Sequence, residues 1–103
     1  MTRNPDQAYI NVLNKFELKA KDSSYNQWFY QNKWILSYYF ITETFALMKQ
    51  VIVSKYDCQF SSLSLAKHYT PQELNDEISN LLQKLKKEQN NFKKREILQD
   101  FEK

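Results

Sequence analysis

The sequence predicts an all-α fold with three main helices. A long antiparallel hairpin would join a helix at about 25–56 to a helix at about 71–100, with a shorter helix at about 5–20 packed across it. The 103 residues contain no glycine and only two prolines, so tight hairpins that need glycine are excluded or strained. Helix-start signals stand at both prolines, and apolar residues recur at helical spacing between them.

The first predicted helix begins at Asn4 and Pro5. Asn can cap a helix, Pro fits the first helical position, and Gln7 can reach back to the cap. Apolar residues then repeat at helical spacing towards Ala20; they are Tyr9, Val12, Leu13 and Phe16. Residues 22–24 (Asp-Ser-Ser) are expected to end this helix and cap the next.

The central predicted helix, residues 25–56, is the most apolar part of the chain. Six residues alternate in steps of four and three, which places them on one stripe of a helix; they are Trp34, Tyr38, Ile41, Phe45, Met48 and Ile52. The other faces of this helix are only partly polar. We therefore expect more apolar surface than the two shorter helices can cover.

Residues 34–53 also have the length of a membrane span, with aromatic residues at one end and lysines on both flanks. Glu43 near the middle and Lys49 oppose insertion, because each costs about 2.5–3.5 kcal/mol at a bilayer centre. A helix in a soluble protein is therefore favoured. A single-pass accessory subunit of a membrane complex, mitochondrial ones included, is the alternative.

The third predicted helix has the clearest start signal in the chain. Thr70 caps, Pro71 takes the first helical position, and Glu73 closes a capping box. One apolar stripe follows, with Leu74, Ile78, Leu81, Leu85 and Phe92. Near 89–91 the pattern falters, so either the helix breaks there or its last turns face a different partner. We treat 1–103 as a single helical domain.

The stripes of the two long helices are expected to face each other. The predicted intramolecular core consists of Trp34, Tyr38, Ile41, Phe45, Met48, Ile52, Leu74, Ile78, Leu81 and Leu85. The remaining apolar surface of the central helix is expected to bind another polypeptide, because monomers rarely expose large apolar patches. That predicted interface consists of Trp28, Phe29, Leu36, Phe40, Glu43, Leu47 and Val51. Glu43 lies either on the wetter side of the helix or against a Lys or Arg of the partner.

A basic run follows in the third helix; it consists of Lys84, Lys86, Lys87, Lys93, Lys94 and Arg95. Such a run is either a solvated helix face or a contact for phosphate groups of nucleic acid or anionic lipid. Phe92 is the one aromatic residue within it, so base-specific recognition is not expected.

No catalytic or metal site is predicted. Asp57, Cys58 and His68 are the candidates for a nucleophile and a base, but they lie in one short connection without a glycine-rich loop for an oxyanion hole. One His and one Cys are too few for structural zinc, and a single Cys forms no internal disulfide. We therefore expect no enzyme, no cofactor and no small-molecule substrate.

These observations together predict a non-enzymatic binding protein, an accessory subunit, adaptor or inhibitor of a larger assembly. Its partner would be another protein or a second copy of itself, with nucleic acid as a weaker alternative. The first nine residues lack the apolar segment of a secretory signal, so we expect an intracellular protein, soluble or within a large complex. Association with a membrane stays open.

Overall fold

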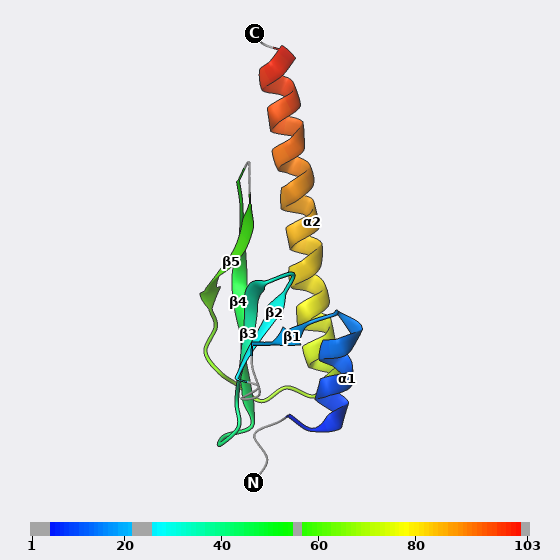
Figure 1. Ribbon diagram of the computed structural model, residues 1–103, viewed down its shortest axis with the longest axis vertical. Helices are drawn as coiled ribbons and strands as arrows, with labels where there is room; N and C mark the ends of the chain where they lie inside the picture. Colours follow the sequence, from blue (N-terminus) through cyan, green and yellow to red (C-terminus); the bar gives the residue numbers. More distant parts are fainter. Residues whose placement is uncertain (1–4, 22–25, 55–56, 102–103) are drawn as a thin grey trace.

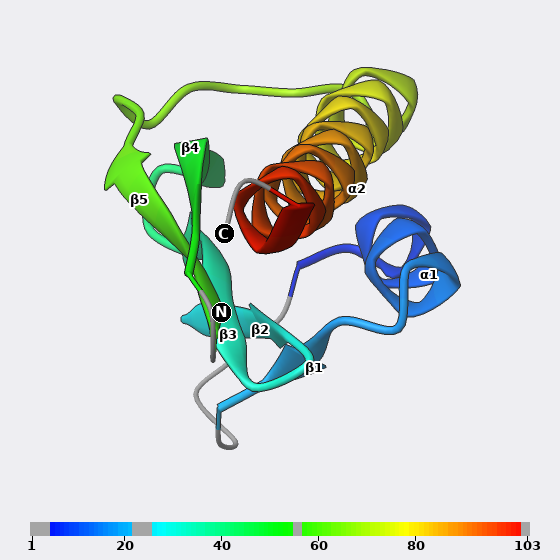
Figure 2. The same ribbon diagram turned by 90° about the horizontal axis from the view of Figure 1, so that it is seen from above.

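The computed structural model describes residues 5–21, 26–54 and 57–101, with the backbone alone for 96–101. Its centre is a five-stranded antiparallel sheet whose strands are neighbours in chain order. One helix precedes the sheet and a long one follows it, and both lie on the same face of the sheet (Figures 1 and 2). The elements are α1 (Gln7–Lys15), β1 (Lys19–Ala20), β2 (Gln27–Tyr30), β3 (Lys33–Tyr39), β4 (Thr44–Val53), β5 (Cys58–Leu63) and α2 (Pro71–Phe101).

The predicted all-α fold is wrong, because the stretch assigned to a central helix forms strands. Residues 25–56 contain β2, β3 and β4, so there is neither a helical hairpin nor a helical bundle. This stretch is rich in aromatic and β-branched side chains, which fit a pleated, half-buried surface better than a helix. The helix predicted at 5–20 is shorter, since α1 ends at Lys15. The helix predicted at 71–100 is present as α2.

The stripe that suggested a central helix is divided between two strands and a turn. Tyr38 of β3 and Phe45 of β4 are register partners, and both are buried. Ile41 lies between them in sequence, but it belongs to the turn and is 77% exposed. The steps of three and four residues therefore reflect a strand–turn–strand unit and not one face of a helix.

Two turns show how a chain without glycine builds this antiparallel sheet. Gln31 and Asn32 join β2 to β3, and both have positive φ, 48° and 68°, which is the signature of a type I′ turn. Asn tolerates left-handed backbone better than most residues. Glu43 takes the same region, with φ 54°, just before β4. A tight hairpin thus forms without glycine, with strained backbone at Gln31 and Asn32, and the absence of glycine did not indicate an all-α fold.

Most of the core lies on the helix-covered face of the sheet. Tyr9 of α1 lies against Phe45, with 5.2 Å between ring centroids, and Phe45 lies against Tyr38 at 4.9 Å. The three rings join α1 to the two central strands. The fifteen buried residues of the core cluster come from every element except β1; they are Leu13, Leu18, Trp28, Ile35, Leu36, Tyr38, Phe45, Leu47, Met48, Phe60, Tyr69, Leu74, Ile78, Leu81 and Leu85.

A β-bulge between β2 and β3 lets two consecutive residues of β3 enter the core. The register shifts between Trp28 and Phe29, whose partners are Leu36 and Trp34, so Ile35 is an extra residue in β3. Ile35 and Leu36 are consecutive, yet both are 0% exposed. A bulge permits this because it interrupts the alternation of side chains between the two faces.

The helix α2 packs on the sheet from its first turn as far as Gln89, whose amide donates to the Cys58 thiol of β5 at 3.9 Å. The Thr70 N–H donates to Glu73 Oε1 at 2.9 Å and the Glu73 N–H donates to Thr70 Oγ1 at 3.1 Å, a complete capping box. Leu74 and Ile78 follow, both 0% exposed. With 31 residues α2 is about 46 Å long, and it runs unbroken through 89–91. Its last turns project past the end of the sheet (Figure 1).

Within the described parts of the chain, no helix combines the length and the apolar character needed to cross a membrane. Residues 34–53, the predicted alternative span, form most of β3, a turn and β4. The predicted spanning helix is therefore not formed.

Candidate functional site

The face of the sheet away from the helices is unusually apolar. Side chains alternate along a strand, so the neighbours of Phe45 and Leu47 in β4 point away from α1 and α2. An antiparallel sheet that is covered on one side normally places polar residues there. On this uncovered face Tyr39, Gln50, Ile52 and Leu63 are exposed or half-buried, whereas Ser37, Thr44, Ala46 and Met48 are buried.

An open cleft of about 710 Å³ lies where β3 enters the turn before β4. Trp34 lies over β3 on the uncovered face, where its indole N–H donates to the Ser37 hydroxyl at 3.2 Å. Tyr39 is 44% exposed and Ile41 is 77% exposed. We call the cleft lined by Trp34, Tyr39, Phe40 and Ile41 the aromatic cleft.

The rim of the aromatic cleft is polar and carries little charge. Asn26, Gln27 and Thr42 contribute amide and hydroxyl groups, and Lys21 is the one charged side chain among the described lining residues. The Thr42 and Thr44 hydroxyls are hydrogen-bonded to each other at 2.7 Å. An apolar floor with a few polar groups at its edge is typical of ligand and peptide sites.

The residues of the predicted partner interface do not form one exposed surface in the structure. Trp28, Leu36 and Leu47 are buried beneath the chain's own helices, and Phe29, Phe40 and Val51 are half-buried. Glu43 is exposed, in the turn beside the aromatic cleft.

The residues of the predicted core are also divided. Seven of them are buried; they are Tyr38, Phe45, Met48, Leu74, Ile78, Leu81 and Leu85. Trp34 is half-buried, whereas Ile41 and Ile52 are exposed. Tyr39, which was assigned to neither set, lines the aromatic cleft. The many aromatic and β-branched residues of this stretch were the signal for strands that could have placed these residues.

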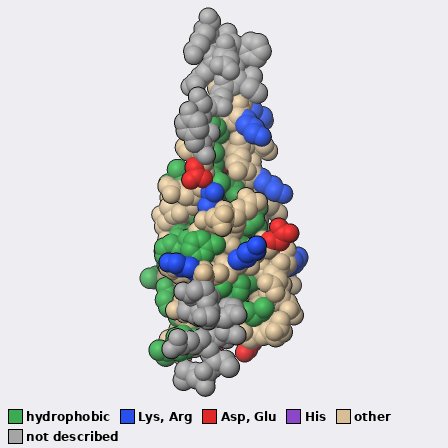
Figure 3. Space-filling model, in the orientation of Figure 1, with side chains coloured by type: hydrophobic (Ala, Val, Ile, Leu, Met, Phe, Trp, Pro, Cys, Tyr) green, Lys and Arg blue, Asp and Glu red, His purple; other side chains and the backbone are tan. Residues whose placement is uncertain are grey.

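The six residues of the basic run are all exposed on α2. Helical periodicity puts Lys86, Lys87, Lys93 and Lys94 on the side of α2 away from Leu81 and Leu85. Lys84 differs, because its ammonium donates to the Lys49 carbonyl of β4 at 3.2 Å. Figure 3 shows Lys and Arg side chains (blue) beside the projecting helix and hydrophobic ones (green) on the body of the molecule.

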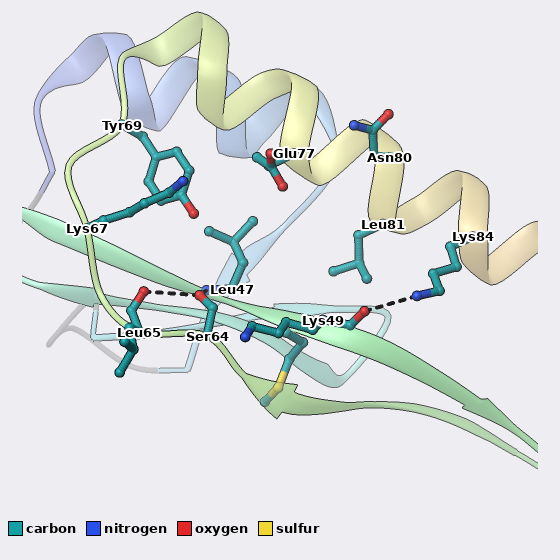
Figure 4. Close-up of a pocket in the computed structure, with 11 residues that line it drawn as sticks. Leu47, Lys49, Ser64, Leu65, Lys67, Tyr69, Glu77, Asn80, Leu81 and Lys84 are labelled. Atoms are coloured by element: carbon teal, nitrogen blue, oxygen red, sulfur yellow. Dashed lines mark hydrogen bonds between the residues drawn. The ribbon is translucent and has the colours of Figure 1, made fainter.

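A second cavity, of about 440 Å³, lies between α2, β4 and the connection that leads to α2. Lys49, Lys67 and Lys84 line it from three separate segments, together with the carboxylate of Glu77 (Figure 4). Leu47 and Leu81 form an apolar floor. We call this cavity the lysine groove.

The lysine groove is anchored by backbone pairing. Lys67 and Phe45 exchange two backbone hydrogen bonds, of 2.9 and 3.0 Å, in an isolated β-bridge. The Lys67 ammonium lies 4.7 Å from the centre of the Tyr69 ring. Burial raises the pKa of the Tyr69 phenol, and the nearby Lys67 ammonium opposes that shift. The connection therefore holds Lys67 and Tyr69 at the end of the groove.

The candidates for a nucleophile and a base do not form a shared site. Asp57 pairs with Lys33 at 3.1 Å, and the Cys58 N–H together with this lysine lowers the pKa of the Asp57 carboxyl. The Cys58 thiol accepts a hydrogen bond from Gln89 at 3.9 Å, while His68 is exposed beyond the far end of β5. In residues 5–21, 26–54 and 57–101, no three His, Cys, Asp or Glu side chains gather as a metal site would require.

No protein-family model, no curated protein and no solved structure matches this chain.

Proposed function

We propose that this chain is a non-enzymatic binding protein that holds another polypeptide in the aromatic cleft. The observation that carries the proposal is the exposure of large apolar side chains on the face of the sheet that no described helix covers. Tyr39 on that face is 44% exposed, and Ile41 in the turn that follows β3 is 77% exposed. An antiparallel sheet with one covered face usually presents polar side chains to water on the other.

The chemistry of the cleft indicates the kind of contact. Trp and Tyr supply large apolar area with few rotatable bonds, and they are enriched among the residues that dominate binding energy. The Trp34 indole is already held by Ser37, so little side-chain entropy would be lost on binding. We infer that a partner inserts an apolar anchor residue between Trp34 and Ile41 and forms hydrogen bonds with the rim. An accessory subunit, adaptor or inhibitor would act in this way.

The test compares two exposed apolar residues on different surfaces. Ile41→Asp places a charge in the aromatic cleft, and Leu65→Asp makes the same change at a residue that is 89% exposed outside it. Tagged wild-type and variant chains would be expressed in the native cells, and the co-purifying proteins quantified. A partner that the wild type and Leu65→Asp retain and Ile41→Asp loses would then be titrated against the purified chain by calorimetry.

We expect Ile41→Asp to weaken the purified complex at least about ten-fold, since truncating a central anchor typically costs over 1 kcal/mol. Equal affinity of the wild type and Ile41→Asp for every recovered partner would refute the aromatic cleft as the binding surface.

Contact with a nucleic-acid backbone is a second candidate function, and one observation favours it. Of the seven charged residues between Lys84 and Arg95, six are basic, and all six are exposed on α2. Counterion release makes such binding fall steeply with salt. Replacing Lys86, Lys87, Lys93 and Lys94 with Gln should abolish binding to a labelled duplex and flatten its salt dependence. An unchanged affinity would exclude this function.

A further inference from the structure

We propose that the lysine groove is a binding site for a small organic anion of the phosphate-monoester class, with its phosphate beside the lysines and its apolar part on Leu47 and Leu81. This site is separate from the aromatic cleft, which lies on the other face of the sheet, so the proposal goes beyond the function proposed above. The sequence did not indicate it, because Lys49, Lys67 and Lys84 belong to three different segments.

The charge of the groove is not balanced by the protein. Three ammonium groups and one carboxylate line it. Among the described side chains, Lys33 and Asp57 form the one ion pair, so none of the three groove lysines is within ion-pair distance of a described acid, although Lys67 is close enough to help lower the pKa of the Glu73 carboxyl. A concave surface lined by one sign of charge concentrates the counter-ion that fits it. The lysines outnumber the one carboxylate in the lining, and this excess of positive charge favours an anion.

The positions of these lysines are set by the fold. The Lys67 backbone is paired with Phe45, and its ammonium lies over the Tyr69 ring. Lys84 spans the groove from α2 to the Lys49 carbonyl. This contact leaves further N–H donors on Lys84, because an ammonium group carries three. Lys67 and Lys84 lie at opposite ends of the groove (Figure 4), so both attract the same anion and its phosphate can accept a hydrogen bond from either one.

The size and the floor of the groove limit the ligand. A cavity of about 440 Å³ lies within the range of small-molecule sites and is too small for a folded partner. Leu81 is 6% exposed and Leu47 is 5% exposed, so the floor is apolar and closely packed. An organic phosphate would cover the small part of this floor that water still reaches, so its apolar part should add modestly to the affinity over an inorganic ion.

Replacing Glu77 should change the ligand affinity in the opposite direction to replacing a groove lysine. Its carboxylate points from α2 into the space between Tyr69 and Leu47 (Figure 4), where it repels an anion. Removing this charge should strengthen binding, while removing a lysine charge should weaken it. A structural role for these exposed residues would not produce opposite effects on one ligand.

The experiment uses the whole chain and three probes followed by amide NMR shifts. Phenyl phosphate is the test ligand, inorganic phosphate lacks the apolar part, and phenol lacks the charge. We expect saturable shifts at Ser64, Lys67 and Glu77 with phenyl phosphate, and weaker binding of both other probes. Lys67→Gln and Lys84→Gln should each weaken binding about three- to ten-fold, as expected for one charge near an anion in water. Glu77→Gln should strengthen it.

Lys87→Gln is the matched control, because Lys87 is an exposed lysine of α2 outside the groove. It should leave the affinity unchanged. Shifts that do not saturate, shifts confined to residues 86–95, or an equal loss in Lys87→Gln would each overturn the proposal. Tighter binding of inorganic phosphate than of phenyl phosphate would overturn the role of the apolar floor.

Discussion

The Tyr9 hydroxyl donates a hydrogen bond to the Tyr69 carbonyl at 2.6 Å, across sixty positions of sequence. The bond joins the first turn of α1 to the connection just before α2. The Tyr9 ring also lies against Phe45 of β4. This one side chain therefore links the start of α1 and the connection before α2 to the sheet. The same contact fixes Tyr69 at the end of the lysine groove.

Tyr9→Phe should lower the free energy of unfolding by about 1 kcal/mol. The substitution keeps the ring on Phe45 and leaves the part-buried Tyr69 carbonyl without its donor, and an unsatisfied buried acceptor costs about 1–3 kcal/mol. Urea unfolding followed by tryptophan fluorescence measures it. Tyr30→Phe is the control, since the Tyr30 hydroxyl contacts only exposed Gln31, at 3.4 Å, among the described hydrogen bonds. Equal midpoints for wild type and Tyr9→Phe would contradict this prediction.

Thr70→Ala should destabilise the chain by about 1 kcal/mol, the usual effect of removing an N-cap hydroxyl. The Glu73 N–H would lose its partner, and the reciprocal bond from the Thr70 N–H would be left without its support. Urea unfolding again measures the change, while Thr70→Ser should restore the wild-type midpoint. A midpoint of Thr70→Ala equal to that of the wild type would argue against the capping box.

Glu73 should make stability depend on pH in the acid range. Hydrogen bonds from the Thr70 backbone and side chain lower the pKa of the Glu73 carboxyl below its ordinary value of 4.5. Its contribution is therefore complete above pH 4.5 and is lost as pH falls through the lower folded pKa. Thermal unfolding of wild type and Glu73→Gln across this range measures it. The difference between them should shrink on acidification, whereas a constant difference would rule out the linkage.

The helix α2 was predictable because its signals are local. Thr70 and Glu73 form a capping box that marks the start of the helix within four residues. Leu74 and Ile78 then place apolar side chains one helical turn apart. The sheet was not predictable in this way, because a strand is stabilised by partners that are distant in sequence. Tyr38 and Phe45 satisfy a helical spacing and a hairpin register equally well, and neither glycine nor proline marks the turn between them.

The candidate sites depended on the same non-local information. The aromatic cleft needs Tyr39 beside Trp34 and Ile41, whereas a helix would place Tyr39 outside the stripe that holds the other two. The lysine groove forms because the fold brings Lys49, Lys67 and Lys84 to one cavity. These residues are far apart in the sequence, so the groove could not be predicted from it. The basic run on α2 was visible, since its residues are adjacent in one helix.

Ile78→Ala should be strongly destabilising, by about 2–5 kcal/mol, because it leaves a cavity at a residue that is 0% exposed between α2 and the sheet. Leu65→Ala removes a similar side chain that is 89% exposed, and it should change stability by under about 0.5 kcal/mol. Urea unfolding of the two variants gives the comparison. Similar losses in both would show that α2 is not packed on the sheet as described.

Changing Gln31-Asn32 to Asn-Gly should stabilise the chain by about 0.5–1 kcal/mol. Both residues have positive φ, where residues with a side chain are strained by about 1–2 kcal/mol and Asn-Gly is the favoured pair of a type I′ turn. Asn32→Val should destabilise by a similar amount, because a β-branched residue is the least tolerant of this region. Gln50→Gly, in the middle of β4, is the control and should lower stability, as glycine does in a strand. Urea midpoints that fall for Asn-Gly as they do for Gln50→Gly would exclude a left-handed turn at 31–32.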